Sequence, residues 1–366
     1  MSGKIKEVFP GGNTSQGFFS YYDHIIAADA RRIMVIKGGP GVGKSTFMRE
    51  LGMELNQKGY DIEFFHCSSD NNSLDGVAIP ALKVALLDGT SPHVVDPKNP
   101  GAVDEIINLG EYWDEAGVRR GKEAIIELNK KVGRLFNRAY RFLKASKAIY
   151  DDLEVINQLG FDDGLANQKA ANLMADIFEN RPVLHQVGNL RKLFISAITP
   201  NGFRNHLSTI IPLATNIYAV TGAPGTGKAT LLAKLATRAI EAGYNCEAYY
   251  CAFDPQKMEH LLIPELEVLI TTAVEPHQDG LELAKELIEM DECIATEVAE
   301  KYGAVLTSHR KVIDGLMQMA IGYLGQAKAA HDKMEEFYVP HMDFGKIALL
   351  REKTLQRILS YATELD

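Results

Sequence analysis

The chain carries an internal repeat, and this repeat limits the possible folds more than any other feature. Residues 33–93 align with residues 217–277 without a gap at a constant offset of 184, and 19 of the 61 pairs are identical. Unrelated segments would share only a handful of identities, so we interpret the chain as a duplicated unit. The identical pairs include Gly38/Gly222, Lys44/Lys228, Tyr60/Tyr244, Cys67/Cys251, Asp70/Asp254, Pro80/Pro264 and His93/His277.

Shorter matches extend the repeat in both directions. Upstream, at an offset of 185, the matching pairs are Phe9/Phe194, Thr14/Thr199, Gly17/Gly202 and Phe18/Phe203. Downstream, at an offset of 181, they are Leu143/Leu324, Lys147/Lys328, Ala148/Ala329, Asp151/Asp332 and Glu154/Glu335. Residues 180–189 contain Pro, Gly and Asn, which interrupt both helical and strand periodicity. We therefore predict two units, residues 1–189 and 190–366.

Within the first unit, apolar runs alternate with a helical pattern. Residues 33–36, 62–65 and 84–87 are short apolar runs typical of buried strands, and residues 46–57 have the pattern of a helix that ends near Gly59. This alternation predicts a parallel sheet covered by helices in each unit. The expected fold class is therefore α/β. Glycine-rich residues 38–45 and 222–229 follow the first strand and its counterpart in the two units, so we expect two P-loop NTPase-like domains.

Each unit also carries a helical extension. Residues 122–158 have apolar side chains at near-helical spacing, which predicts a long helix or a helical hairpin, and its counterpart is expected to begin near Arg310.

Composition excludes several classes of protein. The net charge of −9 disfavours sequence-independent binding to nucleic acid. The four cysteines have no CxxC spacing, so we interpret them as buried thiols in a reducing compartment and not as a disulfide framework or a zinc site. The sequence shows no apolar leader and no apolar stretch of about 18 residues. We therefore expect a cytoplasmic protein without a membrane partner.

Residues 38–45, which we call the first glycine loop, fit the P-loop pattern GxxxxGK[ST] between a predicted strand and a predicted helix. Glycines let successive N–H groups point at one phosphate, and the following helix presents its positive end. Lys44 is expected to reach the terminal phosphates and Ser45 to ligate Mg²⁺. The predicted nucleotide-binding residues are Gly38, Gly39, Pro40, Gly41, Val42, Gly43, Lys44, Ser45 and Thr46. The expected cofactors are ATP, or another NTP, and Mg²⁺; the alternative is a glycine-rich turn without a ligand.

Two acidic residues are candidates for chemistry beside this loop. Asp88 ends the apolar run 84–87, as a Walker B carboxylate near Mg²⁺ does, although an Asp that ends a strand is also common in turns. Asp70 follows the run 62–65, where it can orient an acceptor hydroxyl or an attacking water, or form an Asx turn. His93 is a candidate sensor of the γ-phosphate or part of a structural turn.

Residues 222–229, the second glycine loop, keep the glycines and the lysine. Ala229 replaces the hydroxyl of Ser45, and Thr272 stands at the position of Asp88. Both predicted Mg²⁺ contacts are therefore absent, and we expect a site that binds nucleotide without catalysis, or binds nothing. The predicted binding residues here are Gly222, Gly225, Thr226, Gly227, Lys228, Ala229 and Thr230.

The doubled loops and the segments 82–93 and 95–97 together resemble a family of uncharacterised bacterial tandem P-loop proteins, mainly from Firmicutes, that are described as ATP-binding proteins or ATPases. The resemblance spans nearly the whole chain and implies a cytosolic ATP-binding protein without naming a substrate. Residues 39–44 are also similar to the loops of adenylate-kinase-type and AAA-type proteins.

Two functions fit these observations. The first is ATP hydrolysis, or phosphoryl transfer to a small molecule, at the first glycine loop. The second is a nucleotide-gated switch in which the helical extensions bind a protein partner. The expected partners are a nucleotide and an unidentified small-molecule acceptor or protein, and a homo-oligomer stays open.

Arg134, Arg138 and Arg141 would share one face of the predicted helix 122–158, and their counterparts Gly315, Met319 and Gly322 are uncharged. We predict that this helix acts as a lid and that arginines of this stripe, with Arg138 at its centre, bind the triphosphate or the acceptor; the alternative is a solvated basic face. Single substitutions of such arginines to Ala are expected to lower turnover by about 10³-fold or more, well beyond any change in ATP affinity. Wild-type turnover in all three variants would refute the prediction.

Overall fold

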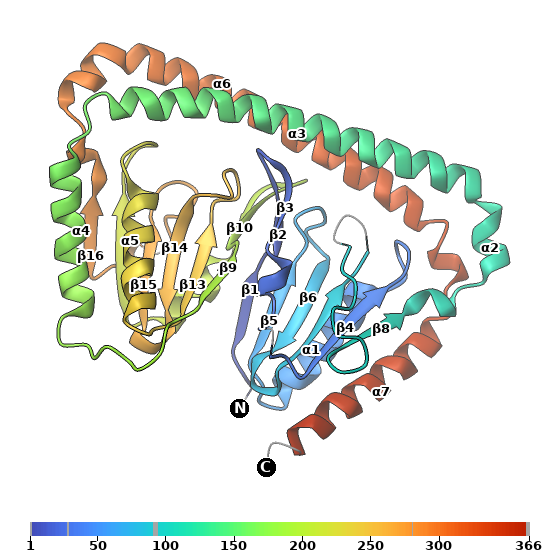
Figure 1. Ribbon diagram of the computed structural model, residues 1–366. Coiled ribbons are helices and arrows are strands. Elements are labelled where there is room, and N and C mark those ends of the chain that lie inside the picture. Colours follow the sequence, from blue (N-terminus) through green and yellow to red (C-terminus); the bar gives the residue numbers. More distant parts are fainter. Residues whose placement is uncertain (1, 28, 91–93, 280, 364–366) are drawn as a thin grey trace.

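The computed structural model describes residues 2–27, 29–90, 94–279 and 281–363 (Figure 1). Strands of the first half are β1 (Ile5–Val8), β2 (Gly11–Thr14), β3 (Gly17–Ser20), β4 (Arg32–Lys37), β5 (Ile62–His66), β6 (Leu74–Ile79), β7 (Val84–Asp88) and β8 (Asp104–Asn108). Its helices are α1 (Lys44–Gln57), α2 (Glu115–Arg120), α3 (Lys122–Gln158) and α4 (Asp163–Phe178).

The second half repeats this order of elements. Its strands are β9 (Leu190–Leu193), β10 (Ser196–Thr199), β11 (Gly202–Asn205), β12 (Asn216–Thr221), β13 (Cys246–Tyr250), β14 (Met258–Ile263), β15 (Val268–Thr272) and β16 (Glu286–Glu289). Its helices are α5 (Lys228–Glu241), α6 (Thr296–Glu335) and α7 (Phe344–Thr363). His93 lies outside the described residues.

Each half builds one six-stranded sheet, with strand order β1-β5-β6-β7-β4-β8 in the first and β9-β13-β14-β15-β12-β16 in the second. The predicted α/β class is confirmed, but the sheets are mixed, because β6 and β14 run antiparallel to both neighbours. Only residues 67–73 join β5 to β6, and a parallel connection needs a dozen residues or more. The sequence analysis missed β6 because no periodic pattern marks it as separate from the loop before it.

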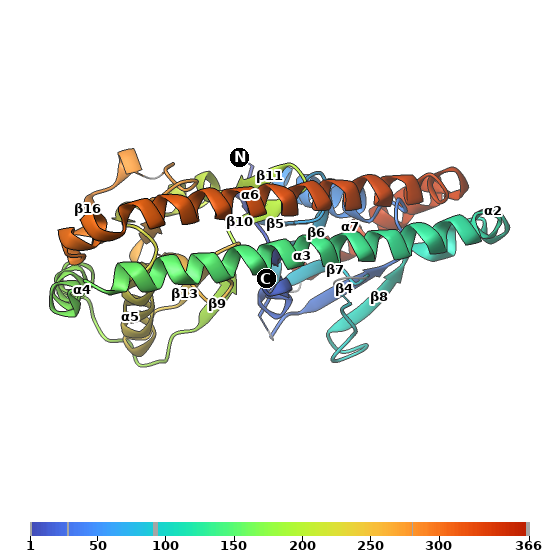
Figure 2. The ribbon, with the colours of Figure 1, turned by 90° about the horizontal axis from the view of Figure 1, so that it is seen from above.

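Helices α3 and α6 run side by side across both halves (Figures 1 and 2). At about 1.5 Å per residue, they span roughly 55–60 Å. The prediction of a helix at residues 122–158 is confirmed, whereas α6 begins at Thr296 and not near Arg310, because no proline interrupts the helix-forming residues 296–309. Their shared buried seam contains Leu135, Ala139 and Leu143 of α3 and Ala320, Leu324, Ala327 and Ala330 of α6.

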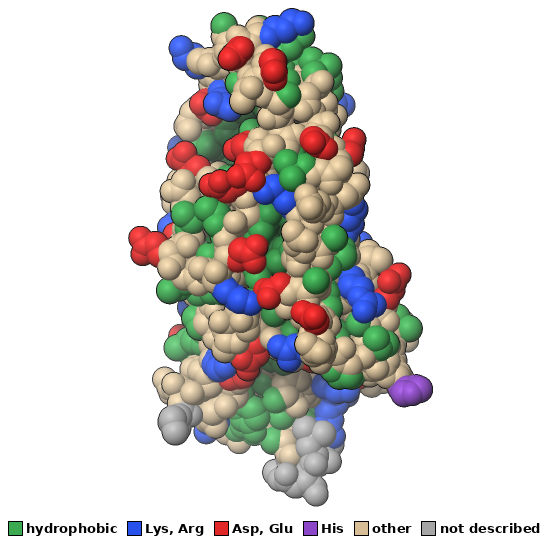
Figure 3. All heavy atoms as spheres, turned by 90° about the vertical axis from the view of Figure 1, so that its left-hand side faces the viewer, with side chains coloured by type: hydrophobic (Ala, Val, Ile, Leu, Met, Phe, Trp, Pro, Cys, Tyr) green, Lys and Arg blue, Asp and Glu red, His purple; other side chains and the backbone are tan. Residues whose placement is uncertain are grey.

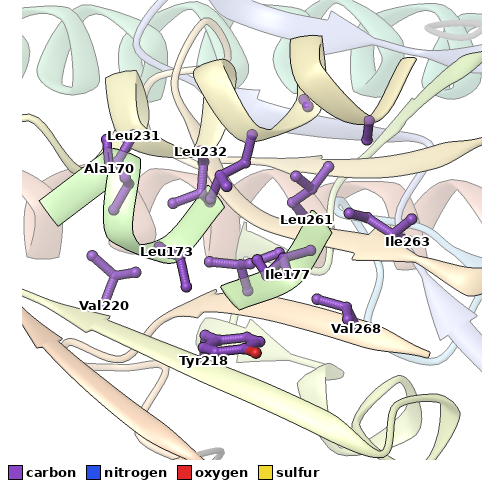
Figure 4. Close-up of a cluster of buried hydrophobic side chains, with 14 of the residues drawn as sticks. Ala170, Leu173, Ile177, Tyr218, Val220, Leu231, Leu232, Leu261, Ile263 and Val268 are labelled. Carbon is purple, nitrogen blue, oxygen red and sulfur yellow. The ribbon is translucent and has the colours of Figure 1, made fainter. Parts of the chain in front are cut away.

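The helical extensions are exchanged between the halves. Helix α4 belongs to the first half of the sequence, but Ala170, Leu173 and Ile177 pack on α5 and on the second sheet, as Figure 4 shows. In the opposite direction, α7 packs on α1 and the first sheet through Ile347, Leu355 and Ile358. Each hydrophobic core is therefore complete only when both halves of the sequence are present.

The other face of each sheet packs against the other sheet. Alternate residues of β7 face different partners, since Leu86 joins the core under α1 and Leu87 joins a cluster shared with Leu262 and Leu269 of the second sheet. Helices thus cover one face of each sheet, and the other sheet covers the opposite face. The sequence had predicted a helix cover for each sheet and gave no sign of sheet-on-sheet packing. Phe9 and its repeat counterpart Phe194 form a two-residue antiparallel bridge at this junction.

A cluster of four charges lies beside that bridge, and we call it the junction cluster. Lys6 contacts Glu63 and Glu247, while Arg191 donates to Glu63 (2.5 Å) and Glu247 (3.0 Å). Burial raises the pKa of both carboxyls, but Lys6 and Arg191 outweigh burial and hold the pKa of Glu63 and Glu247 below its usual range. The pairs Lys6/Arg191 and Glu63/Glu247 are repeat counterparts, so the cluster obeys the symmetry of the duplication.

Figure 3 looks at the end of the molecule formed by α4 and β16. Acidic and basic side chains are interspersed on this face and no patch of one sign dominates it. In the described part of the chain, no helix has an apolar stretch long enough to cross a bilayer.

The junction cluster gives a test of stability. We expect Glu63→Gln to lower the free energy of unfolding by about 3–5 kcal/mol, because it leaves two buried cations to share the single carboxylate of Glu247. Glu127→Gln is the matched control: Glu127 pairs with Arg134 in solvent and is expected to have little effect. Urea unfolding measures both variants.

The same measurement has a pH dependence with a defined sign. Because the folded pKa of Glu63 lies below 4.5, its stabilising contribution is complete above about pH 4.5 and is lost as the pH falls below that value. The wild-type protein should therefore lose stability more steeply below pH 4.5 than Glu63→Gln does. Parallel curves would contradict this assignment.

Candidate functional site

The first glycine loop connects β4 to α1, as the sequence predicted. Gly38, Gly41 and Gly43 have φ values of 155°, 67° and 88°. Residues with a Cβ rarely adopt this positive-φ region of backbone conformation, whereas glycine does so readily. Within the described residues, the N–H groups of Gly43, Lys44 and Ser45 have no acceptor, and no side chain caps α1. Such free donors at the start of a 14-residue helix are the features of an anion site.

The structure brings Lys44 and Asp88 together beside this loop. The ammonium group of Lys44 donates to the carbonyls of Gly38 (3.2 Å) and Gly39 (3.0 Å) and lies 3.6 Å from the Asp88 carboxylate. Asp88 ends β7, which pairs in parallel with β4, and its carboxylate also accepts from the backbone and hydroxyl of Thr90. As the sequence predicted, Asp88 ends a strand next to the one that leads into the glycine loop. A metal role for Asp88 stays a prediction.

The Ser45 hydroxyl accepts a hydrogen bond from the backbone N–H of Leu74, the first residue of β6 (2.9 Å). An oxygen that accepts one hydrogen bond keeps a lone pair for a cation. Thr46, at the next position of the helix, is exposed.

The second half covers the first glycine loop. A Cβ built on Gly39 would lie 2.7 Å from the ring of Tyr338, and one on Gly41 would lie 2.8 Å from Val339 and 3.1 Å from Glu335. Glu335 ends α6, and the other two residues lie in the turn toward α7. Any ligand at this loop therefore meets the C-terminal end of α6.

The second glycine loop is covered in the same way by the first half. A Cβ on Gly225 would lie 2.7 Å from the backbone oxygen of Glu154, and the side-chain amide of Asn157 donates to the carbonyl of Pro224 (2.7 Å). Glu154 and Glu335 are repeat counterparts, so α3 and α6 each bring the same residue of the repeat to the loop of the opposite half.

A cavity of about 900 Å³ opens at the second glycine loop, where the sequence predicted the weaker site. Its wall includes Gly222, Gly225, Thr226, Gly227, Lys228, Ala229 and Thr230, all predicted binding residues. Further charged residues of the wall are Glu154, Asp163, Lys234, Asp254, Lys257, Glu259, Glu275 and Arg310. The predicted binding residues of this loop therefore do line a cavity.

Sequence comparison of the two loops missed one carboxylate. Glu259 lies on β14, one residue before His260, which pairs with Thr271 of the antiparallel neighbour β15. Glu259 is therefore beside Thr272, the residue that replaces Asp88, and both line the cavity. The repeat alignment places an acidic residue at this position in both units, as the pair Asp75/Glu259. A single acidic residue within a strand matches no known motif, so the sequence did not mark it as a candidate.

Lys228 differs from Lys44 in its surroundings. It donates to the carbonyls of Gly222 (2.5 Å) and Ala223 (2.7 Å), and Thr272 offers no charge at the place of Asp88. Burial lowers the pKa of Lys228 to about 8, although Asp291, Glu154 and Glu259 partly oppose this effect. A buried ammonium group of this kind gains from an anion bound at the loop.

Asp70 and Asp254 form cross-half ion pairs. Asp70 accepts from the backbone of Asn72 (3.1 Å) and the hydroxyl of Ser73 (2.8 Å), and it lies 3.4 Å from Lys328 of α6. Asp254 lies 3.2 Å from Lys147 of α3. The Asx turn that the sequence left as an alternative for Asp70 is thus present, and a role of Asp70 in catalysis stays a prediction.

The arginine stripe of α3 has other partners in this structure. Arg134 pairs with Glu127 (2.9 Å), the Arg138 guanidinium lies 5.5 Å from the ring centre of Tyr323, and Arg141 is exposed. Among the described residues, the helices of the extensions that reach the first glycine loop are α6, through Glu335, and α7, through Phe344. The lid role of Arg138 therefore stays a prediction that would require α3 to move. Arg310 of α6 lines the cavity of the second loop and was not predicted.

Comparison with protein-family models, with curated proteins and with solved structures gives no match for this chain.

The pKa of Lys228 predicts a pH dependence. Its folded value of about 8 lies below the usual 10.5, so the charged lysine destabilises the fold below pH 8, and this cost is relieved between about pH 8 and 10.5. Relative to Lys228→Met, which carries no charge, the wild-type protein should gain about 1.4 kcal/mol of stability per pH unit in this interval. Urea unfolding of both proteins in phosphate-free buffer measures the difference, and a difference independent of pH would contradict the prediction.

Proposed function

We propose that the chain is a cytoplasmic P-loop nucleotide-binding protein that hydrolyses ATP, or transfers its terminal phosphoryl group to a small molecule, at the first glycine loop. The observation that carries the proposal is the set of N–H groups at Gly43, Lys44 and Ser45 that have no partner among the described residues, with the Lys44–Asp88 pair beside it. Donors and an ammonium group directed at one point favour a polyphosphate. The choice of ATP over other nucleotides rests on the resemblance to tandem P-loop ATP-binding proteins.

The residues present fit a magnesium nucleotide. The loop N–H groups would bind phosphate oxygens, and Lys44 would exchange the carbonyls of Gly38 and Gly39 for the terminal phosphates. Ser45 has a free lone pair and Asp88 a carboxylate, which are the oxygen ligands that Mg²⁺ accepts directly or through water. Mg²⁺ bound there would neutralise charge that develops on the phosphoryl group.

We assign the second glycine loop a regulatory role. Its cavity and its lysine favour an anion, while Ala229 and Thr272 offer no Mg²⁺ ligand equivalent to Ser45 and Asp88. With a pKa of about 8, Lys228 is mostly charged at neutral pH and would gain a counter-ion on binding nucleotide, so binding there would stabilise the fold without catalysis.

A nucleotide-gated switch is the second candidate, and one observation favours it. Glu335 of α6 contacts the first glycine loop and Glu154 of α3 contacts the second, so both sites meet one helix pair. A nucleotide that displaces either helix end would shift that pair, which spans the whole molecule (Figure 2). In this case binding matters and turnover does not.

Variants of the two lysines separate these functions. We expect Lys44→Ala to abolish Mg-dependent turnover, whereas Lys228→Ala keeps it within a few-fold and changes stability or regulation, because only the first loop has both oxygen ligands. Asp88→Asn should weaken Mg-ATP more than metal-free ATP, because its charge acts on the ion first. Calorimetric binding and phosphate release are measured in parallel for each variant.

The outcomes divide clearly. Loss of turnover in Lys228→Ala, with nucleotide still bound at the first loop, would refute our choice of the active half. Equal weakening by Asp88→Asn with and without Mg²⁺ would give Asp88 a purely structural role. Tight binding with almost no turnover in the wild-type protein would favour the switch, and turnover only with an added acceptor would favour a kinase.

A further inference from the structure

Three potential metal ligands meet behind the second glycine loop. Glu259 and His260 lie on β14, and His277 lies beyond the end of β15. One ligand atom of each residue lies within 4.8 Å of the others, and Nε2 of His277 is 3.2 Å from Oε2 of Glu259. The two imidazole rings meet edge to face, with their centres 4.8 Å apart.

The two histidines are buried without the partners that buried rings normally have. His260 is 0% exposed and His277 is 1% exposed. Within the described residues, Nε2 of His260 and both ring nitrogens of His277 have no hydrogen-bond partner, since the His277–Glu259 contact lacks hydrogen-bond geometry. A buried polar atom that is left unpaired is costly, so these atoms call for a ligand that the protein itself does not supply.

The remaining nitrogen of His260 is already held. Its Nδ1 lies 2.7 Å from the hydroxyl of Thr271, a residue of the neighbouring strand β15. In metal sites, a partner of this kind on one ring nitrogen orients the other nitrogen toward the ion. With Nδ1 held by Thr271, Nε2 is the nitrogen of His260 that is left for an ion.

We propose that Glu259, His260 and His277 form a binding site for one divalent transition-metal ion, with Zn²⁺ as the expected occupant. Two imidazoles and one carboxylate are a known three-ligand set for Zn²⁺ that leaves one position open. Ligands at about 2.0–2.2 Å from one ion lie within about 4 Å of one another, so small side-chain rotations complete the set. Mg²⁺ prefers oxygen ligands and is disfavoured by the two imidazoles.

A second cluster of the same residue types does not share these properties. Glu7 is held between His66 (3.3 Å) and His206 (3.4 Å), one at each carboxylate oxygen. Hydrogen bonds from His206 and His66 hold the pKa of Glu7 well below its usual range. Glu7 and His206 are half-buried, and among the described residues no polar atom of this cluster is buried without a partner, so it serves as the matched control.

The proposed metal site belongs to the second half alone. Gly76 occupies the position of His260 in the first repeat, so the ligand set has no equivalent there. Glu259 also lines the cavity of the second glycine loop, which places the ion at the cavity wall. The site requires neither nucleotide nor Mg²⁺ and therefore stands or falls independently of the proposed function.

The test is a titration of tag-free, chelator-treated protein with Zn²⁺ in calorimetry and with Co²⁺ in visible absorption, without nucleotide or Mg²⁺. We expect one ion per chain and the d–d bands of a low-coordinate Co²⁺ site. Thr271→Val should weaken binding about 10–100-fold, because it removes the partner that orients His260. His277→Ala and His277→Gln should weaken it further, and circular dichroism shows whether each variant folds.

Controls at the Glu7 cluster make the assignment specific. His206→Ala and Glu7→Gln should bind Zn²⁺ as the wild-type protein does. Absence of stoichiometric binding to the folded wild-type protein overturns the proposal even if the His277 variants do not fold. Loss of binding in His206→Ala, with full binding in His277→Gln, also overturns it, because the ion would then lie at the Glu7 cluster.

Discussion

Helices α3 and α6 pack along a seam of alanines and leucines, and this packing brings one end of each helix to a glycine loop. Because the helices are antiparallel and cross both halves, the end of α3 reaches the second loop and the end of α6 reaches the first. The same arrangement sends α4 into the second core and α7 into the first (Figures 1 and 4). A small shift along the seam would move Glu154 and Glu335 together.

The two loops share one backbone geometry but differ in charge. Lys44 has Asp88 at 3.6 Å, whereas Lys228 is buried without a carboxylate at the equivalent place and has a pKa of about 8. Duplication preserved the glycines and the helix that follows, since both are needed for the turn. The two halves differ in side chains on their strands: Thr272 stands at the position of Asp88 at the end of a strand, and His260 stands at the position of Gly76 within one. The surroundings of the second loop therefore contain side chains that the first loop lacks.

Much of each unit was predictable because its signals are local. The strand 33–36, the glycine loop and the helix 46–57 are adjacent in the chain, and the spacing of apolar residues in α3 is unbroken for its full length. The strands β6 and β14 and the helices α4 and α7 were missed. No residue pattern near β6 indicates that it pairs antiparallel with both neighbours. The apolar face of α4 packs on the core of the other half, which the local sequence does not identify. Cross-half pairs such as Asp70–Lys328 were hidden for the same reason.

By itself, the sequence determined the duplication, the α/β class, both glycine loops and the asymmetry between Ser45 and Ala229, because each depends on residue identity or on short-range spacing. Only the tertiary structure decided the exchange of the helical extensions, the cavity at the second loop and the meeting of Glu259, His260 and His277. These features arise where strands from distant parts of the chain pair in a sheet, and strand register is a property of that pairing. The identical pairs Lys147/Lys328 and Glu154/Glu335 showed in the sequence that the two long helices are related by the repeat. Only the packing of α3 against α6 determined which glycine loop each helix end contacts.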